Sequence, residues 1–119
     1  MIRAAIMGAA GAALAVAPAL AVDRLSPSDI QTTFFNGQPF TSWTASDTKF
    51  TMVFTPDGKV TRAPQGKAGA KGEGTWKLSD DGFCTTWKKS KPNCYGLAKS
   101  GDNKWSVLKG TSAVAYWSK

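Results

Sequence analysis

The spacing of apolar residues changes once along the chain, from a helical spacing near residue 30 to an alternating one further on. Ser26 is a suitable N-cap, Pro27 suits the first helical position, and Asn36-Gly37 is a common helix end. Between these signals, Ile30 and Phe34 fall near one face together with Phe35. The pattern predicts a short helix of about two to three turns.

After residue 37 the period is two, which is typical of strands. Lys49–Thr55 places Phe50, Met52 and Phe54 on one side, and Pro56-Asp57-Gly58 is a strong turn. Further strands are predicted over Lys59–Arg62, Gly74–Leu78, Phe83–Lys88, Asn93–Ala98, Lys104–Lys109 and Ala113–Trp117, with a turn at Ser100-Gly101-Asp102-Asn103. The spacing predicts a mostly β fold, a single antiparallel meander curled into a small barrel or half-barrel.

One stretch breaks the alternation. Pro64–Gly72 contains three glycines and two lysines, Lys67 and Lys71, and has no large apolar side chain. It predicts a mobile basic loop, either a plain connection or a lid over a site. It does not continue into Gly-Lys-Ser/Thr, so it is not a phosphate-binding loop of that type.

The first residues have the pattern of a secretory signal peptide. A basic start at Arg3 precedes an uncharged, Ala-rich run over Ala4–Leu20, and Ala19-Leu20-Ala21 fits a small-x-small cleavage site. We therefore predict a signal peptide over residues 1–21, cleavage after Ala21, a mature domain over 22–119, and a periplasmic or secreted location. The Ala and Gly content favours this over a retained membrane anchor, which is the alternative.

Charge narrows the choice of partners. Without Arg3 the chain has fourteen Lys and Arg against eight acids, so the predicted mature domain is basic, with a net charge of about +6. Such a charge favours anionic partners such as acidic glycans, lipid head groups or nucleic acid, although nothing in the sequence is specific for nucleic acid. The alternative is that the charge serves solubility alone.

Cys84 and Cys94 are the only cysteines, and an exported chain favours their oxidation. A turn at Lys88–Ser90 would set Cys84 opposite Cys94 and Thr86 opposite Pro92. Because Pro92 has no N–H to donate, that pair must be non-hydrogen-bonded, and alternation gives the cysteines the same close geometry. We predict a structural disulfide that contributes about 2–3 kcal/mol.

The chain has no histidine, so the commonest metal ligand and the usual general base are missing. Glu73 is the only glutamate, and Asp80 and Asp81 fall in a predicted turn. We predict no enzymatic activity, no metal site and no cofactor.

Aromatic residues are the remaining signal. Trp76 and Trp105 share faces with aliphatic residues and fit core positions, whereas Trp87 lies among lysines at a hairpin end. Trp87 either seals one end of the barrel or stacks on a ligand. Two candidate sites follow. The contacts for a ligand or an anion are Trp87, Lys67, Lys71, Lys88, Lys89 and Lys91, and the candidate apolar cavity is lined by Phe50, Met52, Phe54 and Trp76.

These motifs resemble those of small exported β-proteins of unknown function that are common in alphaproteobacteria. The resemblance is carried by Pro56-Asp57-Gly58, Gly74-Thr75-Trp76, Cys84-Thr85-Thr86-Trp87 and Cys94. It implies a lipocalin-like or half-barrel sheet in the periplasm, and it implies no activity.

The sequence therefore favours a monomeric, non-enzymatic binding module. Its ligand would be a small apolar molecule in the barrel mouth or an anionic polymer or lipid surface held by the lysines near Trp87. The alternative is a periplasmic interaction protein, such as an inhibitor or an envelope accessory factor.

Overall fold

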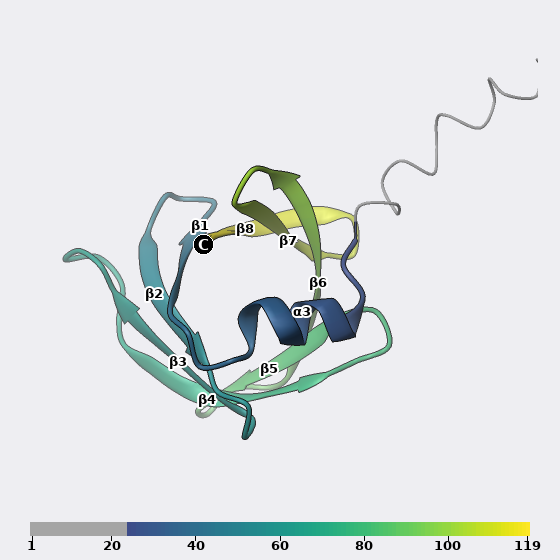
Figure 1. Ribbon diagram of the computed structural model, residues 1–119. Coiled ribbons are helices and arrows are strands. Elements are labelled where there is room, and N and C mark those ends of the chain that lie inside the picture. The colour runs from purple at the N-terminus through teal and green to yellow at the C-terminus, as the bar shows by residue number, and fades with distance from the viewer. Residues whose placement is uncertain (1–23) are drawn as a thin grey trace, which may run out of the picture.

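The computed structural model describes residues 24–119, so the predicted signal peptide, its cleavage site and the start of the mature domain lie outside the described residues. The described part is mostly β. Eight antiparallel strands form a closed barrel in which each strand pairs with the next and β8 returns to β1 (Figure 1). The elements are α3 (Pro27–Phe34), β1 (Phe40–Thr44), β2 (Lys49–Phe54), β3 (Lys59–Pro64), β4 (Gly72–Leu78), β5 (Phe83–Trp87), β6 (Asn93–Gly101), β7 (Lys104–Lys109) and β8 (Ser112–Ser118).

The mostly β meander predicted from the sequence is confirmed, and its sheet closes fully. Some predicted strand ends were wrong. Pro64 and Gly72 belong to β3 and β4, which shortens the basic loop to residues 65–71. Strand β6 continues through Gly101, so the next turn contracts to Asp102 and Asn103, where Asn103 takes the left-handed conformation with φ of 57°.

Helix α3 forms as its end signals predict. The Ser26 side chain accepts a hydrogen bond from the Asp29 backbone N–H at 3.1 Å, which satisfies one of the free donors of the first turn. At the other end the Asn36 side-chain amide donates to the Thr32 carbonyl at 3.0 Å, and Gly37 has a φ of 86°. Glycine adopts that conformation without penalty, which allows the chain to turn into the barrel.

Helix α3 lies across one end of the barrel and closes it (Figure 1). Ile30, Phe34 and Phe35 are at most 1% exposed. Phe35 stacks on Phe54 with ring centroids 4.3 Å apart, and Phe34 meets Trp105 edge to face at 4.9 Å. The helix therefore completes the core. Among residues 24–119, no helix is long and apolar enough to cross a membrane.

Consecutive antiparallel strands place their connections alternately at the two ends of the barrel. The turn after β2 lies near α3, because Phe35 packs on Trp76 and the Trp76 indole donates to the Thr55 carbonyl at 2.8 Å. We call this the closed end. Residues 45–48, 65–71, 88–92 and 110–111 connect strands at the opposite end, which we call the open end.

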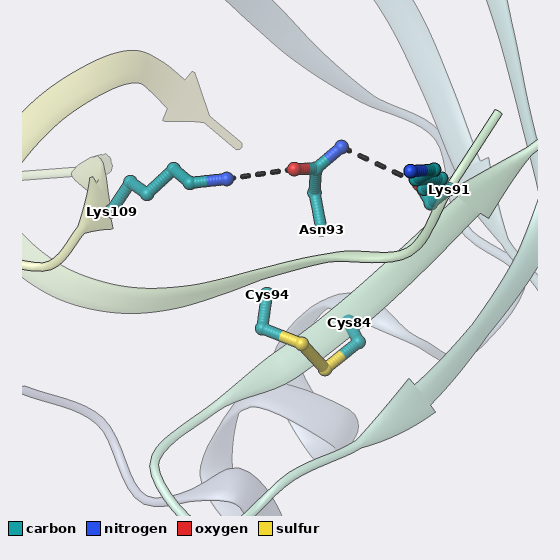
Figure 2. Close-up of a disulfide and its surroundings, with 5 residues drawn as sticks. All are labelled: Cys84, Lys91, Asn93, Cys94 and Lys109. Carbon is teal, nitrogen blue, oxygen red and sulfur yellow. Dashed lines mark hydrogen bonds between the residues drawn. A yellow bond between two sulfur atoms is a disulfide. The ribbon is translucent and has the colours of Figure 1, made fainter.

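The predicted disulfide between Cys84 and Cys94 is present, with the two Cα atoms 3.9 Å apart (Figure 2). It joins β5 to β6, which pair at only three positions, Phe83↔Tyr95, Cys84↔Cys94 and Thr85↔Asn93. This is the shortest pairing around the barrel. The disulfide therefore reinforces the seam with the fewest backbone pairs.

Candidate functional site

A cavity of about 240 Å³ lies inside the barrel at its open end. Its lining residues are Ser42, Thr44, Phe50, Met52, Phe54, Arg62, Phe83, Thr85, Trp87, Tyr95, Val107, Val114, Ala115 and Trp117. The structure thus brings together Phe50, Met52 and Phe54, which alternate along β2 and point inward.

Trp76, the fourth residue predicted for this wall, is not among the lining residues. It lies at the closed end, where its ring packs on Phe35 and its indole N–H donates a hydrogen bond to the Thr55 carbonyl. Trp76 therefore belongs to the core beneath the cavity.

Arg62 brings a positive charge into the cavity wall. Its guanidinium carbon lies 4.7 Å from the centre of the Trp87 ring and 5.2 Å from that of Phe50. Its Nε is buried and has no hydrogen-bond partner within residues 24–119. The two aromatic faces attract the cation but do not accept its N–H donors in the way that an oxygen does.

The neighbouring strands make room for this side chain. Arg62 on β3 is paired with Met52 on β2 and with Gly72 on β4. A Cβ added at Gly72 would lie 3.0 Å from Arg62 Nε and 3.3 Å from Trp87 Cε3. Because Gly72 has no side chain, the Arg62 guanidinium and the Trp87 indole can both lie against the β4 backbone at this position.

Further polar groups lie around the same space. Ser42 and Thr85, which are 7% and 3% exposed, contribute hydroxyl-bearing side chains to the wall. Burial raises the pKa of the Tyr95 phenol. Lys109 places its ammonium 5.6 Å from the centre of the Tyr95 ring and donates to Asn93 Oδ1 at 2.7 Å (Figure 2). The cavity thus combines aromatic walls with hydroxyls and nearby cations.

A bulge in β8 adds an apolar residue at the open end. The pairing between β7 and β8 shifts so that Val107 faces Ala115 but Leu108 faces Ala113, which leaves Val114 as the extra residue. Val114 is 38% exposed and lines the cavity beside Ala115. Bulges redirect side chains in this way, and alternation alone gives no sign of them.

The basic loop over residues 65–71 lies at the rim of the cavity. A Cβ added at Gly69 would come within 2.8 Å of Phe50 Cζ, so the loop backbone rests on the Phe50 ring. The loop is fixed at its start by Gln65, whose side chain donates to the hydroxyls of Thr41 and Thr51, at 3.1 Å in each case.

The predicted anion contacts all gather at the open end. Trp87 is half-buried with its ring against Arg62, and the predicted lysines are exposed on two connections there. The eight cations of the open end are Lys49, Arg62, Lys67, Lys71, Lys88, Lys89, Lys91 and Lys109, and its two acids are Asp47 and Glu73. Elsewhere in residues 24–119, six Lys and Arg stand against five acids, and one of the six, Arg24, also reaches the open-end connection at Gly110. The excess positive charge is therefore concentrated around the cavity entrance.

A larger hollow of about 590 Å³ lies on the outer surface, lined by Arg24, Ser79, Asp80, Asp81, Cys94, Tyr95, Gly96, Leu108 and Gly110. Arg24 donates from Nη2 to the Gly110 carbonyl at 2.6 Å, so this cation already has an acceptor. The hollow lies on the outer face of the sheet, and both spaces open to solvent. The smaller cavity is the better candidate because strands surround it and Arg62 Nε inside it has no acceptor.

Comparison with protein-family models, with curated proteins and with solved structures gave no match. Across the described residues, His, Cys, Asp and Glu side chains do not gather in any group of three or more that could hold a metal ion. The site is therefore characterised by its own geometry, which is that of an aromatic cavity with a positively charged entrance.

Proposed function

We propose that this protein is a non-enzymatic binding module that takes a small, mainly apolar ligand into the barrel through its open end. The observation that carries the proposal is the cavity of about 240 Å³, closed beneath by α3 and walled by Phe50, Met52 and Phe54. Concave, mostly apolar spaces with a few polar groups are the usual form of small-molecule sites. Barrels of eight strands are of a size to hold one small ligand, as in lipocalins.

The size of the cavity limits its ligand. It holds about eight water-sized volumes, so the enclosed part of a ligand has about eight to ten non-hydrogen atoms. A ligand of that size binds with a dissociation constant in about the micromolar to millimolar range.

We also propose that the module works outside the cytoplasm, in the periplasm or after secretion. The signal-like pattern over residues 1–21 supports this location, and the Cys84–Cys94 disulfide is compatible with it. Native mass spectrometry of the protein purified from its own periplasm tests the proposal. We expect a chain that begins at Val22, contains one disulfide, is monomeric and carries a retained small molecule.

Calorimetric titration with a neutral probe, 3-phenylpropan-1-ol, tests the cavity directly. Ala115→Phe places a ring in the cavity and should abolish binding, while Ala113→Phe, at an exposed position of the same strand, should leave it unchanged. If neither the alcohol nor a retained molecule is found, or if both variants bind like the unmodified protein, the proposal is wrong.

A second candidate function rests on the charge of the open end. The exposed lysines at positions 67, 71, 88, 89 and 91 could together hold an anionic polymer or an anionic lipid surface. Such binding should fall steeply as the salt concentration rises from 50 to about 200 mM. Binding that does not depend on salt would contradict this candidate. A stoichiometric protein partner in a pull-down from periplasmic extract would instead favour an inhibitor or an envelope accessory factor.

A further inference from the structure

Arg62 is half-buried, and its Nε is the buried side-chain polar atom that lacks a hydrogen-bond partner within residues 24–119. The guanidinium carbon lies 4.7 Å from the centre of the Trp87 ring and 5.2 Å from that of Phe50. A buried donor without an acceptor destabilises the folded state, and more so when the group is charged. Such an arrangement is expected where an acceptor is supplied from outside the chain.

The acids of the open end are badly placed to be that acceptor. Glu73 follows Gly72 on β4, and Gly72 is the residue paired with Arg62, so alternation turns the Glu73 side chain to the outer face. Asp47 lies in the connection between β1 and β2, with an exposed side chain. Neither of them lines the cavity.

We propose that the ligand of this cavity is an amphipathic carboxylate, whose acid group accepts hydrogen bonds from Arg62 and whose apolar body lies against Phe50, Met52 and Phe54. This inference rests on the proposed binding function and names the chemical class of the ligand. A guanidinium is well suited to the role, because its planar set of donors matches the geometry of a carboxylate.

Other groups support the same ligand. The hydroxyls of Ser42 and Thr85 and the phenol of Tyr95 can donate to a second carboxylate oxygen. The excess of six positive charges at the open end attracts an anion toward the entrance over the range of the Debye length, about 8 Å at physiological salt. An approaching anion is therefore drawn to the open end, where Arg62 lines the cavity opposite Met52 on the neighbouring strand.

A charge series on one molecular frame tests the proposal with the unmodified protein. We would titrate it by calorimetry with 3-phenylpropanoate, 3-phenylpropan-1-ol and 3-phenylpropylamine, which differ mainly in the terminal group. The acid should bind at least about tenfold more tightly than the alcohol, as expected for a charge-assisted hydrogen bond. The amine should bind more weakly than the alcohol.

Arg62→Met should weaken binding of the acid about tenfold or more and change binding of the alcohol less than about threefold. Arg62→Lys should keep a preference for the acid. Lys77→Met is the matched control, since it removes one positive charge from an exposed position of the barrel, and it should leave both affinities unchanged.

The outcomes separate the two proposals. If the acid and the alcohol bind equally to the unmodified protein, the carboxylate is not recognised and this inference is wrong, while the cavity stands. An equal loss of both ligands in Arg62→Met would assign Arg62 a structural role and also overturn it. If none of the three probes binds, the proposed binding function itself fails.

Discussion

The disulfide gives the most quantitative prediction. We would replace both cysteines, as Cys84→Ala with Cys94→Ala, so that neither a free thiol nor a new polar group is left at the buried position 84. The barrel should still form, because the described core lies on the inner face and is closed by α3. Its free energy of unfolding should fall.

The magnitude follows from the loop that the disulfide closes. Cys84 and Cys94 are ten residues apart in sequence, and the chain-entropy relation gives about 2.7 kcal/mol at 25 °C for a loop of that length. In a domain of this size, 1 kcal/mol corresponds to about 4–8 °C in Tm, so the loss amounts to about 10–20 °C. This is a large share of the stability of a small domain.

The assay is urea unfolding of the oxidised protein, the reduced protein and the double variant. The reduced protein and the double variant should agree. Amide exchange should also quicken most at Thr85 and Tyr95, because β5 and β6 pair at only three positions. A loss below about 1 kcal/mol, with no change in exchange at this seam, would refute the reasoning.

Three further changes test the core and the closed barrel. Phe35→Ala should lower the free energy of unfolding by about 3–5 kcal/mol in urea, since the ring is 1% exposed and stacks on Phe54; a loss near 1 kcal/mol would show that α3 does not hold the core together. Gly82→Ala should lower the free energy of unfolding by about 2–3 kcal/mol, because the added Cβ would overlap the Tyr95 carbonyl oxygen. Gly66→Ala, whose Cβ meets nothing within 4 Å, should change it by less than about 0.5 kcal/mol, and equal effects would contradict this packing. Burial raises the pKa of the Tyr95 phenol, so the unfolded chain loses the phenol proton at a lower pH than the folded protein does. The free energy of unfolding should therefore fall as the pH rises above about 10. Tyr95→Phe should lose that part of the alkaline fall in urea midpoints measured from pH 8 to 11, and an unchanged pH profile would show that burial does not shift this group.

Local signals along the chain were sufficient for much of the fold. The N-cap at Ser26, the turn at Pro56–Gly58 and the pairing of Cys84 with Cys94 each depend on a few neighbouring residues, and the structure contains all three. The apolar alternation along β2 also placed Phe50, Met52 and Phe54 correctly on the inner face.

The composition of the site was less predictable. Trp76 shares the inner face with the cavity residues, but it lies below the point where Phe35 and α3 close the barrel. The alternation of apolar residues indicates which face a side chain is on and does not indicate how far along the barrel the cavity extends. Arg62 could have been found, since it alternates with the buried Val60 and so occupies an inward position of a predicted strand. Val114 could not, because it enters the cavity through a bulge.

Under the proposed binding function, the position of α3 also determines how a ligand enters and leaves the barrel. A barrel open at both ends could let a molecule pass through, whereas the closed end of this barrel is filled by Ile30, Phe34 and Phe35. Backbone hydrogen bonds from Leu25 N–H to the Leu97 carbonyl and from Gly37 N–H to the Phe54 carbonyl hold the helical segment in place. A ligand would therefore bind and dissociate through the open end. A partner or surface that covers the open end would lower the association and dissociation rate constants of the ligand by the same factor, so the residence time would lengthen while the affinity stayed the same.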